Sequence, residues 1–176
     1  MQSFDNALLE WVHGFSSLAL DGFFKFATDF GGVTVVTLVT IFLAIFFVSR
    51  RRYESSARLL VGVGGAVAVS TLLKMLIGRA RPDLWPQLVS ETSHSFPSNH
   101  ATASLALVFC LGFLLWQTKY RWWVVGLGTL YVMIIALSRL YLGVHFPTDI
   151  LGGWFVAVVW VSLVWRLSER FQFQKA

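Results

Sequence analysis

The sequence alternates between long apolar stretches and short polar junctions. The stretches that are apolar along most of their length are residues 32–49, 55–76, 98–117, 121–139 and 147–167. At about 1.5 Å per residue of helix, each is nearly as long as the roughly 30 Å hydrocarbon core of a bilayer. The pattern therefore predicts an all-α fold, a polytopic transmembrane helix bundle with about five spanning helices.

Two shorter segments precede the first of these stretches. In residues 3–16 apolar side chains recur at helical spacing while Asp5 and Glu10 face elsewhere, which predicts an N-terminal amphipathic helix at the membrane interface. Its apolar positions are Ala7, Leu8, Trp11, Val12 and Phe15. Residues 20–30 are interrupted by three charged side chains and followed by a glycine pair, so we expect this segment not to span.

The composition is that of a membrane protein. Of the 176 residues, 56% are hydrophobic and 13% are charged, against about 25% charged in soluble domains. We expect one domain over residues 1–176. The net charge of +5 comes without a basic patch beside exposed aromatics, so nucleic acid is not an expected partner. The single Cys110 excludes a disulfide framework, and we expect no signal peptide because the N-terminus lacks a basic start.

Local signals refine the spans. Small residues in the 55–76 stretch, Gly62, Gly64, Gly65, Ala66 and Ala68, are expected to let a neighbouring helix approach closely. Ser98 is a plausible N-cap, and Pro147 suits the first turn of a helix. Residues 77–97 are polar and broken by prolines, which predicts a long functional loop.

The basic residues predict the orientation of the bundle. They gather at alternate ends of the spans, at Arg50, Arg51, Arg52, Arg58, Lys119, Arg121, Arg166, Arg170 and Lys175. By the positive-inside rule this side, with the C-terminus, faces the cytoplasm. The 77–97 and 140–146 loops then lie on the non-cytoplasmic face of the cell inner (plasma) membrane.

Three polar clusters fall on that outer side. They are Lys74 with Arg81, then Ser98-Asn99-His100, then Arg139 with His145 and Asp149. A charge at the centre of a spanning helix costs about 2.5–3.5 kcal/mol on insertion scales. A single cation at the interface is explained by snorkelling. Three cations beside hydroxyl and amide donors at a helix start instead indicate a phosphate-binding site.

Two histidines supply the chemistry that displacement at phosphorus requires. Asp149 follows His145 by four residues, so in a helical turn its carboxylate accepts a hydrogen bond from one imidazole nitrogen and leaves the other free to attack. His100 then remains for the general acid. His13 and His94 lack such neighbours, and we interpret them as ordinary interfacial histidines.

Together the clusters resemble the three-part signature of the type 2 phosphatidic acid phosphatases, which share their site with vanadium haloperoxidases. The matching residues are Lys74, Arg81-Pro82, Pro97-Ser98-Asn99-His100, Ser138-Arg139, His145 and Asp149. The resemblance covers residues of about 70–155. The middle motif of the family usually has glycine where this chain has Asn99. An asparagine still offers its backbone N–H and tolerates unusual dihedral angles.

The resemblance implies a metal-independent phosphatase that passes through a phosphohistidine, with no cofactor and no metal ligands. By motif position His145 is the nucleophile, Asp149 its orienting partner and His100 the general acid. The phosphate-binding residues are then Lys74, Arg81, Ser98, Asn99 and Arg139.

The expected substrate is a phosphomonoester or diphosphate on a lipid headgroup in the bilayer. The resemblance to compact bacterial members of the family suggests undecaprenyl diphosphate first, followed by phosphatidylglycerophosphate, phosphatidic acid and lipid A phosphates. Lipid-to-lipid phosphate transfer would use the same residues. A lipid-binding or lipid-transporting protein is the alternative outside enzymes, but it would not need both histidines and Asp149. A haloperoxidase is disfavoured because those relatives are soluble. The oligomeric state stays open.

Overall fold

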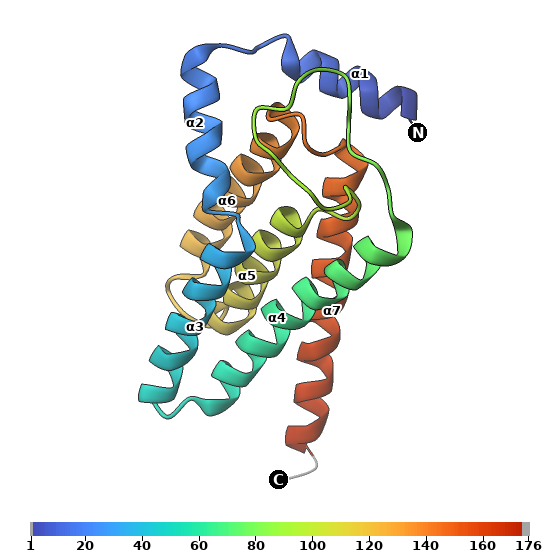
Figure 1. Ribbon diagram of the computed structural model, residues 1–176. Helices are drawn as coiled ribbons and strands as arrows, with labels where there is room; N and C mark the ends of the chain where they lie inside the picture. The colour runs from blue at the N-terminus through green and yellow to red at the C-terminus, as the bar shows by residue number, and fades with distance from the viewer. Residues whose placement is uncertain (1, 174–176) are drawn as a thin grey trace.

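The structure, a computed structural model, describes residues 2–173, which form seven helices and no strand (Figure 1). The helices are α1 (Gln2–His13), α2 (Leu18–Asp29), α3 (Val33–Ser49), α4 (Tyr53–Ile77), α5 (Asn99–Leu115), α6 (Arg121–Tyr141) and α7 (Pro147–Phe173). Each apolar stretch of the sequence is therefore a helix. The all-α bundle that the pattern predicted is confirmed.

Not every predicted span forms a helix that is long and apolar enough to cross a membrane by itself. The helices α4, α6 and α7 are long and apolar enough to do so, whereas α5 is a shorter apolar helix. The helix α3 meets the same criterion only together with α2, from which it is bent by 45°. By itself α2 has only 12 residues, in agreement with the expectation that residues 20–30 do not span alone. Of the charges in α2, the Asp21 carboxylate accepts a hydrogen bond from the Tyr141 hydroxyl at 2.6 Å.

The centre of the bundle is α5, which packs against α4, α6 and α7. The predicted close approach occurs at two glycines of α4. A methyl group added at Gly62 would lie 2.5 Å from the sulfur of Cys110 on α5, and one at Gly65 would lie 2.3 Å from the Trp160 indole on α7. Ala66 is also buried, whereas Gly64 and Ala68 are exposed. The outer surface carries large apolar side chains such as Phe42, Leu76 and Phe155, as expected for lipid-facing positions.

The N-terminal helix α1 lies across one end of the bundle (Figure 1). It is amphipathic, but its buried face differs from the predicted one. Leu9 and Val12 are buried together with Asp5, whereas Trp11 is 63% exposed. The prediction that Asp5 faces away from the apolar side was wrong because this carboxylate is paired with Arg79.

The two ends of the bundle differ in chemistry. The long loop after α4 and the connection between α6 and α7 lie at the end covered by α1 (Figure 1). The α3–α4 turn, which carries three arginines, and the C-terminal part of α7 lie at the opposite end. The fold thus brings the predicted polar clusters to one end and the arginine-rich turn to the other.

Candidate active site

The long loop is fixed above the first turns of α5 and α7 by backbone hydrogen bonds. The N–H of Ser95 donates to the carbonyl of Arg79 at 2.8 Å, and the N–H of Ser98 donates to the carbonyl of Asp149 at 3.0 Å. Ser98 is also the N-cap of α5, as predicted. Three segments that are distant in the sequence therefore share one site.

His145 lies in the connection before α7 and is only 2% exposed. Its Nδ1 is 3.4 Å from Oδ2 of Asp149, and its Nε2 is 3.3 Å from a guanidinium nitrogen of Arg81. An arginine has no acceptor, so Nε2 must accept and Nδ1 must carry the proton toward Asp149. The geometry thus gives the tautomer in which Nε2 carries the unprotonated lone pair.

The surroundings of His145 keep its imidazole neutral. Burial lowers the pKa of His145 well below its ordinary value of 6.5, and the nearby charges of Arg139, Arg81 and Lys74 lower this pKa further. The unprotonated form is the one that can attack phosphorus.

Asp149 is fully buried in the first turn of α7, which begins at Pro147 as predicted. Its Oδ2 accepts the backbone N–H of Phe146 at 2.9 Å as well as facing His145. Its Oδ1 accepts from Arg79 at 2.6 Å. Both oxygens of the carboxylate are therefore held in place.

Arg81 extends from the long loop toward His145. Its Nη1 donates to the carbonyl of Val144 at 2.7 Å, and its Nε donates to the carbonyl of Ser93 at 2.7 Å. Its Nη2 is 3.4 Å from Oε2 of Glu91. The guanidinium is thus oriented by backbone carbonyls directly beside Nε2 of His145.

Arg139 is 1% exposed and pairs with the carboxylate of Glu91, the same group that Arg81 contacts. Its Nη2 donates to Glu91, and its Nη1 donates to the hydroxyl of Thr28 at 2.8 Å. Its Nε has no hydrogen-bond partner within the described residues 2–173. A buried guanidinium with an unused donor is a candidate binder for an anion.

Lys74 is buried near the end of α4, and its ammonium donates to the carbonyl of His94 at 2.5 Å. At the start of α5, Asn99 turns toward α4, where its Oδ1 accepts from the Ser70 hydroxyl at 2.6 Å and its Nδ2 donates to Thr71 at 3.2 Å. The Asn99 side chain therefore joins the two helices through both its oxygen and its nitrogen.

These residues surround a cavity of about 290 Å³. Its walls are formed by Gly32, Val33, Thr34, Lys74, Arg81, Glu91, Ser93, Asn99, His100 and His145. Both predicted histidines are thus brought to one space. Of the other predicted residues, Ser98 is fully buried at the cap of α5, Asp149 lies behind His145, and Arg139 connects to the cavity through Glu91.

Sequence reasoning missed the roles of Glu91 and Asp5. Glu91 is a carboxylate in an aperiodic loop, and its position relative to the arginines had no signal in the sequence. Asp5 looked like part of the solvated face of α1. Arg79 lay beside the motif, but its partners could not be read from spacing: it contacts Asp5, Thr148 and Asp149.

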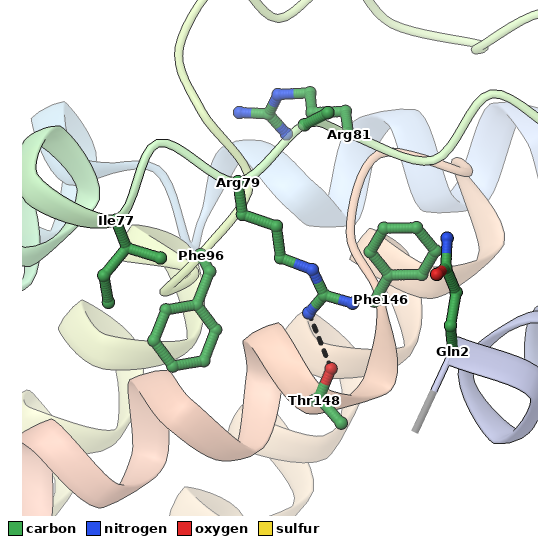
Figure 2. Close-up of a pocket in the computed structure, with 8 residues that line it drawn as sticks. Gln2, Ile77, Arg79, Arg81, Phe96, Phe146 and Thr148 are labelled. Atoms are coloured by element: carbon green, nitrogen blue, oxygen red, sulfur yellow. Dashed lines mark hydrogen bonds between the residues drawn. The ribbon is translucent and has the colours of Figure 1, made fainter.

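A second hollow, of about 650 Å³, opens on the same end of the bundle (Figure 2). Arg79 and Arg81 line it together with the apolar side chains of Ile77, Phe96 and Phe146. Arg81 therefore borders both spaces. Among residues 2–173, no group of three His, Cys, Asp or Glu side chains is arranged to hold a metal ion.

Comparison with known proteins gives consistent matches. The family model described as the PAP2 superfamily matches residues 55–173. Phosphatidylglycerophosphatase B of Bacillus subtilis is 32% identical over 141 residues, which are 77% of this chain and 68% of that protein. The putative undecaprenyl-diphosphatase YbjG of Escherichia coli is 30% identical over 156 residues, 80% of this chain and 74% of that protein.

A solved structure extends the similarity to three dimensions. The crystal structure of the first transmembrane PAP2 type phosphatidylglycerolphosphate phosphatase, from Bacillus subtilis, superposes with a TM-score of 0.86 at 28% identity. The match covers 96% of this chain and 86% of that one. The similarity therefore includes α1 and α2, which lie outside the residues that the family model matches.

Proposed function

The chain belongs to the PAP2 superfamily and is a membrane lipid phosphatase, and from this premise we propose its substrate, mechanism and orientation. Its substrate is a lipid whose terminal phosphate enters the cavity between His100 and His145. The observation that carries the proposal is the convergence of two imidazoles, Lys74 and Arg81 on one cavity of about 290 Å³.

We propose undecaprenyl diphosphate as the first substrate and phosphatidylglycerophosphate as the second. The relatives named for these activities support both. Three cations, Lys74, Arg81 and Arg139, favour a strongly anionic head, and a diphosphate carries more negative charge than a monoester. A terminal phosphate is the part that both lipids share.

In the proposed reaction, Nε2 of His145 attacks the terminal phosphorus. A P–N bond forms while the bond from phosphorus to the leaving oxygen breaks. The His145 ring becomes an imidazolium, which Asp149 stabilises through Nδ1. His100 donates a proton to the leaving oxygen, and the negative charge of the bound phosphate favours the imidazolium form that this step needs.

A water molecule then completes the reaction. His100, now neutral, accepts a proton from the water as it attacks phosphorus. The P–N bond breaks, inorganic phosphate leaves, and His145 returns to its neutral form. The cations stabilise the charge that builds up on the phosphoryl oxygens in both steps.

We propose that the site faces away from the cytoplasm in the cell inner membrane. The support is the arginine-rich turn at the opposite end of the bundle, by the positive-inside rule. A C-terminal fusion to green fluorescent protein should fluoresce, and a C-terminal fusion to alkaline phosphatase should be inactive. The reverse pair of results would contradict this orientation.

The function is tested by measuring phosphate release in detergent from the two lipids above, phosphatidic acid and a lipid A phosphate, with EDTA present. We expect release that EDTA leaves unchanged and that His145→Ala abolishes. Absence of release from all four lipids by folded protein would contradict the substrate proposal. Activity that EDTA removes would contradict the metal-independent mechanism.

A further inference from the structure

A chain of charged groups joins α1 to the carboxylate beside His145. Arg79 donates through Nη1 to Asp149 at 2.6 Å and through Nη2 to Asp5 at 2.8 Å. The guanidinium thus spans two carboxylates, one on the amphipathic helix and one at the active site. Asp5 and Arg79 are 74 positions apart in the sequence.

Thr148 closes this chain into a network. Its hydroxyl donates to Oδ2 of Asp5 at 2.6 Å and accepts from Nη1 of Arg79 at 2.7 Å. Its backbone N–H donates to Oδ1 of Asp5 at 3.1 Å. Asp5 therefore binds the first turn of α7 directly, one residue before Asp149.

The burial of Asp5 shows that this contact is not a surface ion pair. The carboxylate is fully buried, and a buried charge is costly unless it is paired and hydrogen-bonded. Burial alone raises the pKa of Asp5, but its hydrogen bonds with Thr148 and Arg79 bring that pKa below its ordinary value. The ionised form of Asp5 is thus the one that the network holds.

Figure 2 shows Arg79 in the wall of the larger hollow, with its guanidinium directed at Thr148 and Phe146 beside it. The guanidinium carbon is 4.3 Å from the centre of the Phe146 ring. Because one cation faces two carboxylates, Arg79 adds no surplus positive charge to this hollow. Its geometry fits the positioning of a carboxylate better than the binding of an anion.

We propose that Asp5 and Arg79 are positioning residues that fix the carboxylate of Asp149 and, through it, the imidazole of His145. Arg79 holds Oδ1 of Asp149, so that Oδ2 remains directed at Nδ1 of His145. Asp5 holds Arg79 in that place. The contact of Asp5 with Arg79, rather than the docking of α1 as a whole, thereby becomes a condition for full activity. This inference rests on the proposed role of His145.

The test compares kcat and KM of purified Asp5→Asn and Arg79→Gln with the wild type in detergent, using the lipid that the panel identifies. A catalytic group misplaced by about 1 Å loses about 100-fold in rate, so we expect kcat to fall by about 100-fold in Arg79→Gln. We expect a fall of roughly tenfold in Asp5→Asn, since Arg79 keeps its bond to Asp149 there. KM should change little because neither residue touches the phosphate.

Two variants of α1 serve as matched controls. Glu10→Gln removes an exposed carboxylate from the same helix. His13→Ala removes a ring that stacks on Trp85 with centroids 4.0 Å apart, and so weakens the docking of α1 without touching the network. We expect both to retain kcat near the wild-type value. Equal losses in His13→Ala and Asp5→Asn would overturn a specific role for Asp5.

The double variant Asp5→Asn/Arg79→Gln separates positioning from a general loss of structure. If Asp5 acts through Arg79, the double variant is no slower than Arg79→Gln alone, whereas independent effects multiply. Multiplied losses, or a wild-type kcat in folded Asp5→Asn, would overturn the inference. If Asp5→Asn does not fold, Thr148→Val, which lacks the hydroxyl that donates to Asp5 and accepts from Arg79, replaces it in the same comparison.

His145→Ala, assayed in parallel, keeps this inference distinct from the proposed mechanism. An inactive His145→Ala with a fully active Asp5→Asn would reject the positioning role alone. An active His145→Ala would reject the nucleophile assignment itself.

Discussion

Glu91→Gln should make the enzyme bind inorganic phosphate more tightly. The carboxylate of Glu91 lies between the guanidinium groups of Arg81 and Arg139, which we propose as ligands of the substrate phosphate. A phosphate that reaches these groups must displace Glu91. The substitution to glutamine keeps the size of the side chain and removes the competing negative charge.

The size of the effect follows from the burial of Arg139, whose side chain is only 2% exposed. Removing one partner of a buried ion pair costs about 3–5 kcal/mol. The Glu91 side chain is 24% exposed, so we take the lower end of that range, about 3 kcal/mol. A phosphate that replaces the lost negative charge recovers part of this free energy. Since 1.4 kcal/mol corresponds to tenfold in affinity, we expect the inhibition constant of phosphate to fall at least about tenfold.

The assay measures competitive inhibition by inorganic phosphate at fixed pH and ionic strength. Thermal unfolding of Glu91→Gln with and without phosphate provides a second readout: the midpoint should be lower than that of the wild type without phosphate and rise more when phosphate is added. Asp83→Asn, which removes an exposed carboxylate from the same loop, is the matched control. An unchanged or higher inhibition constant in folded Glu91→Gln would refute the competition argument.

Further predictions concern the histidines and the departure at Asn99. His145→Ala should reduce kcat by about 10⁴-fold or more, as does loss of a nucleophile elsewhere; phosphate release measures this. His100→Ala should cost about 10²–10⁴-fold on lipids but less on activated aryl phosphates, which need no proton on the leaving oxygen; an equal loss on both would argue against the acid role. The pKa of His145 is lowered in the folded protein, so on acidification the unfolded chain binds this proton at a higher pH than the folded chain does. The free energy of unfolding should therefore fall as the pH drops below about 6.5. The thermal midpoint should fall less over the same pH range in His145→Ala. Asn99→Gly removes two side-chain hydrogen bonds to α4 and should cost about 2 kcal/mol of stability at about 1 kcal/mol each, while kcat stays near the wild-type value; denaturation and turnover check the two parts.

Much of the bundle and of the motif residues could be predicted because the signals are local. A long apolar stretch predicts a helix whatever elements pack against it in the fold. Ser98 and Pro147 mark the starts of α5 and α7 through the chemistry of helix ends. The four-residue spacing of His145 and Asp149 predicts that their side chains face each other. In the structure, Nδ1 of His145 is 3.4 Å from Oδ2 of Asp149.

The contacts that sequence reasoning missed depend on tertiary structure. Glu91 meets Arg139 across 48 positions through a loop without periodicity. Asp5 is buried because Arg79 and Thr148 satisfy it, and no rule based on the pattern of α1 alone can anticipate a buried carboxylate. The hydrogen bond between Asp21 and Tyr141 of a distant helix depends on tertiary structure in the same way.

The proposed mechanism requires that Nε2 of His145 attacks phosphorus. Its most direct test is to incubate the wild type and His145→Ala with a lipid substrate labelled with ³²P at its terminal phosphate, quench in alkali, and map the labelled peptide by mass spectrometry. We expect label on His145 of the wild type and none on His145→Ala. Label on any other residue, or an equal amount in both proteins, would contradict it.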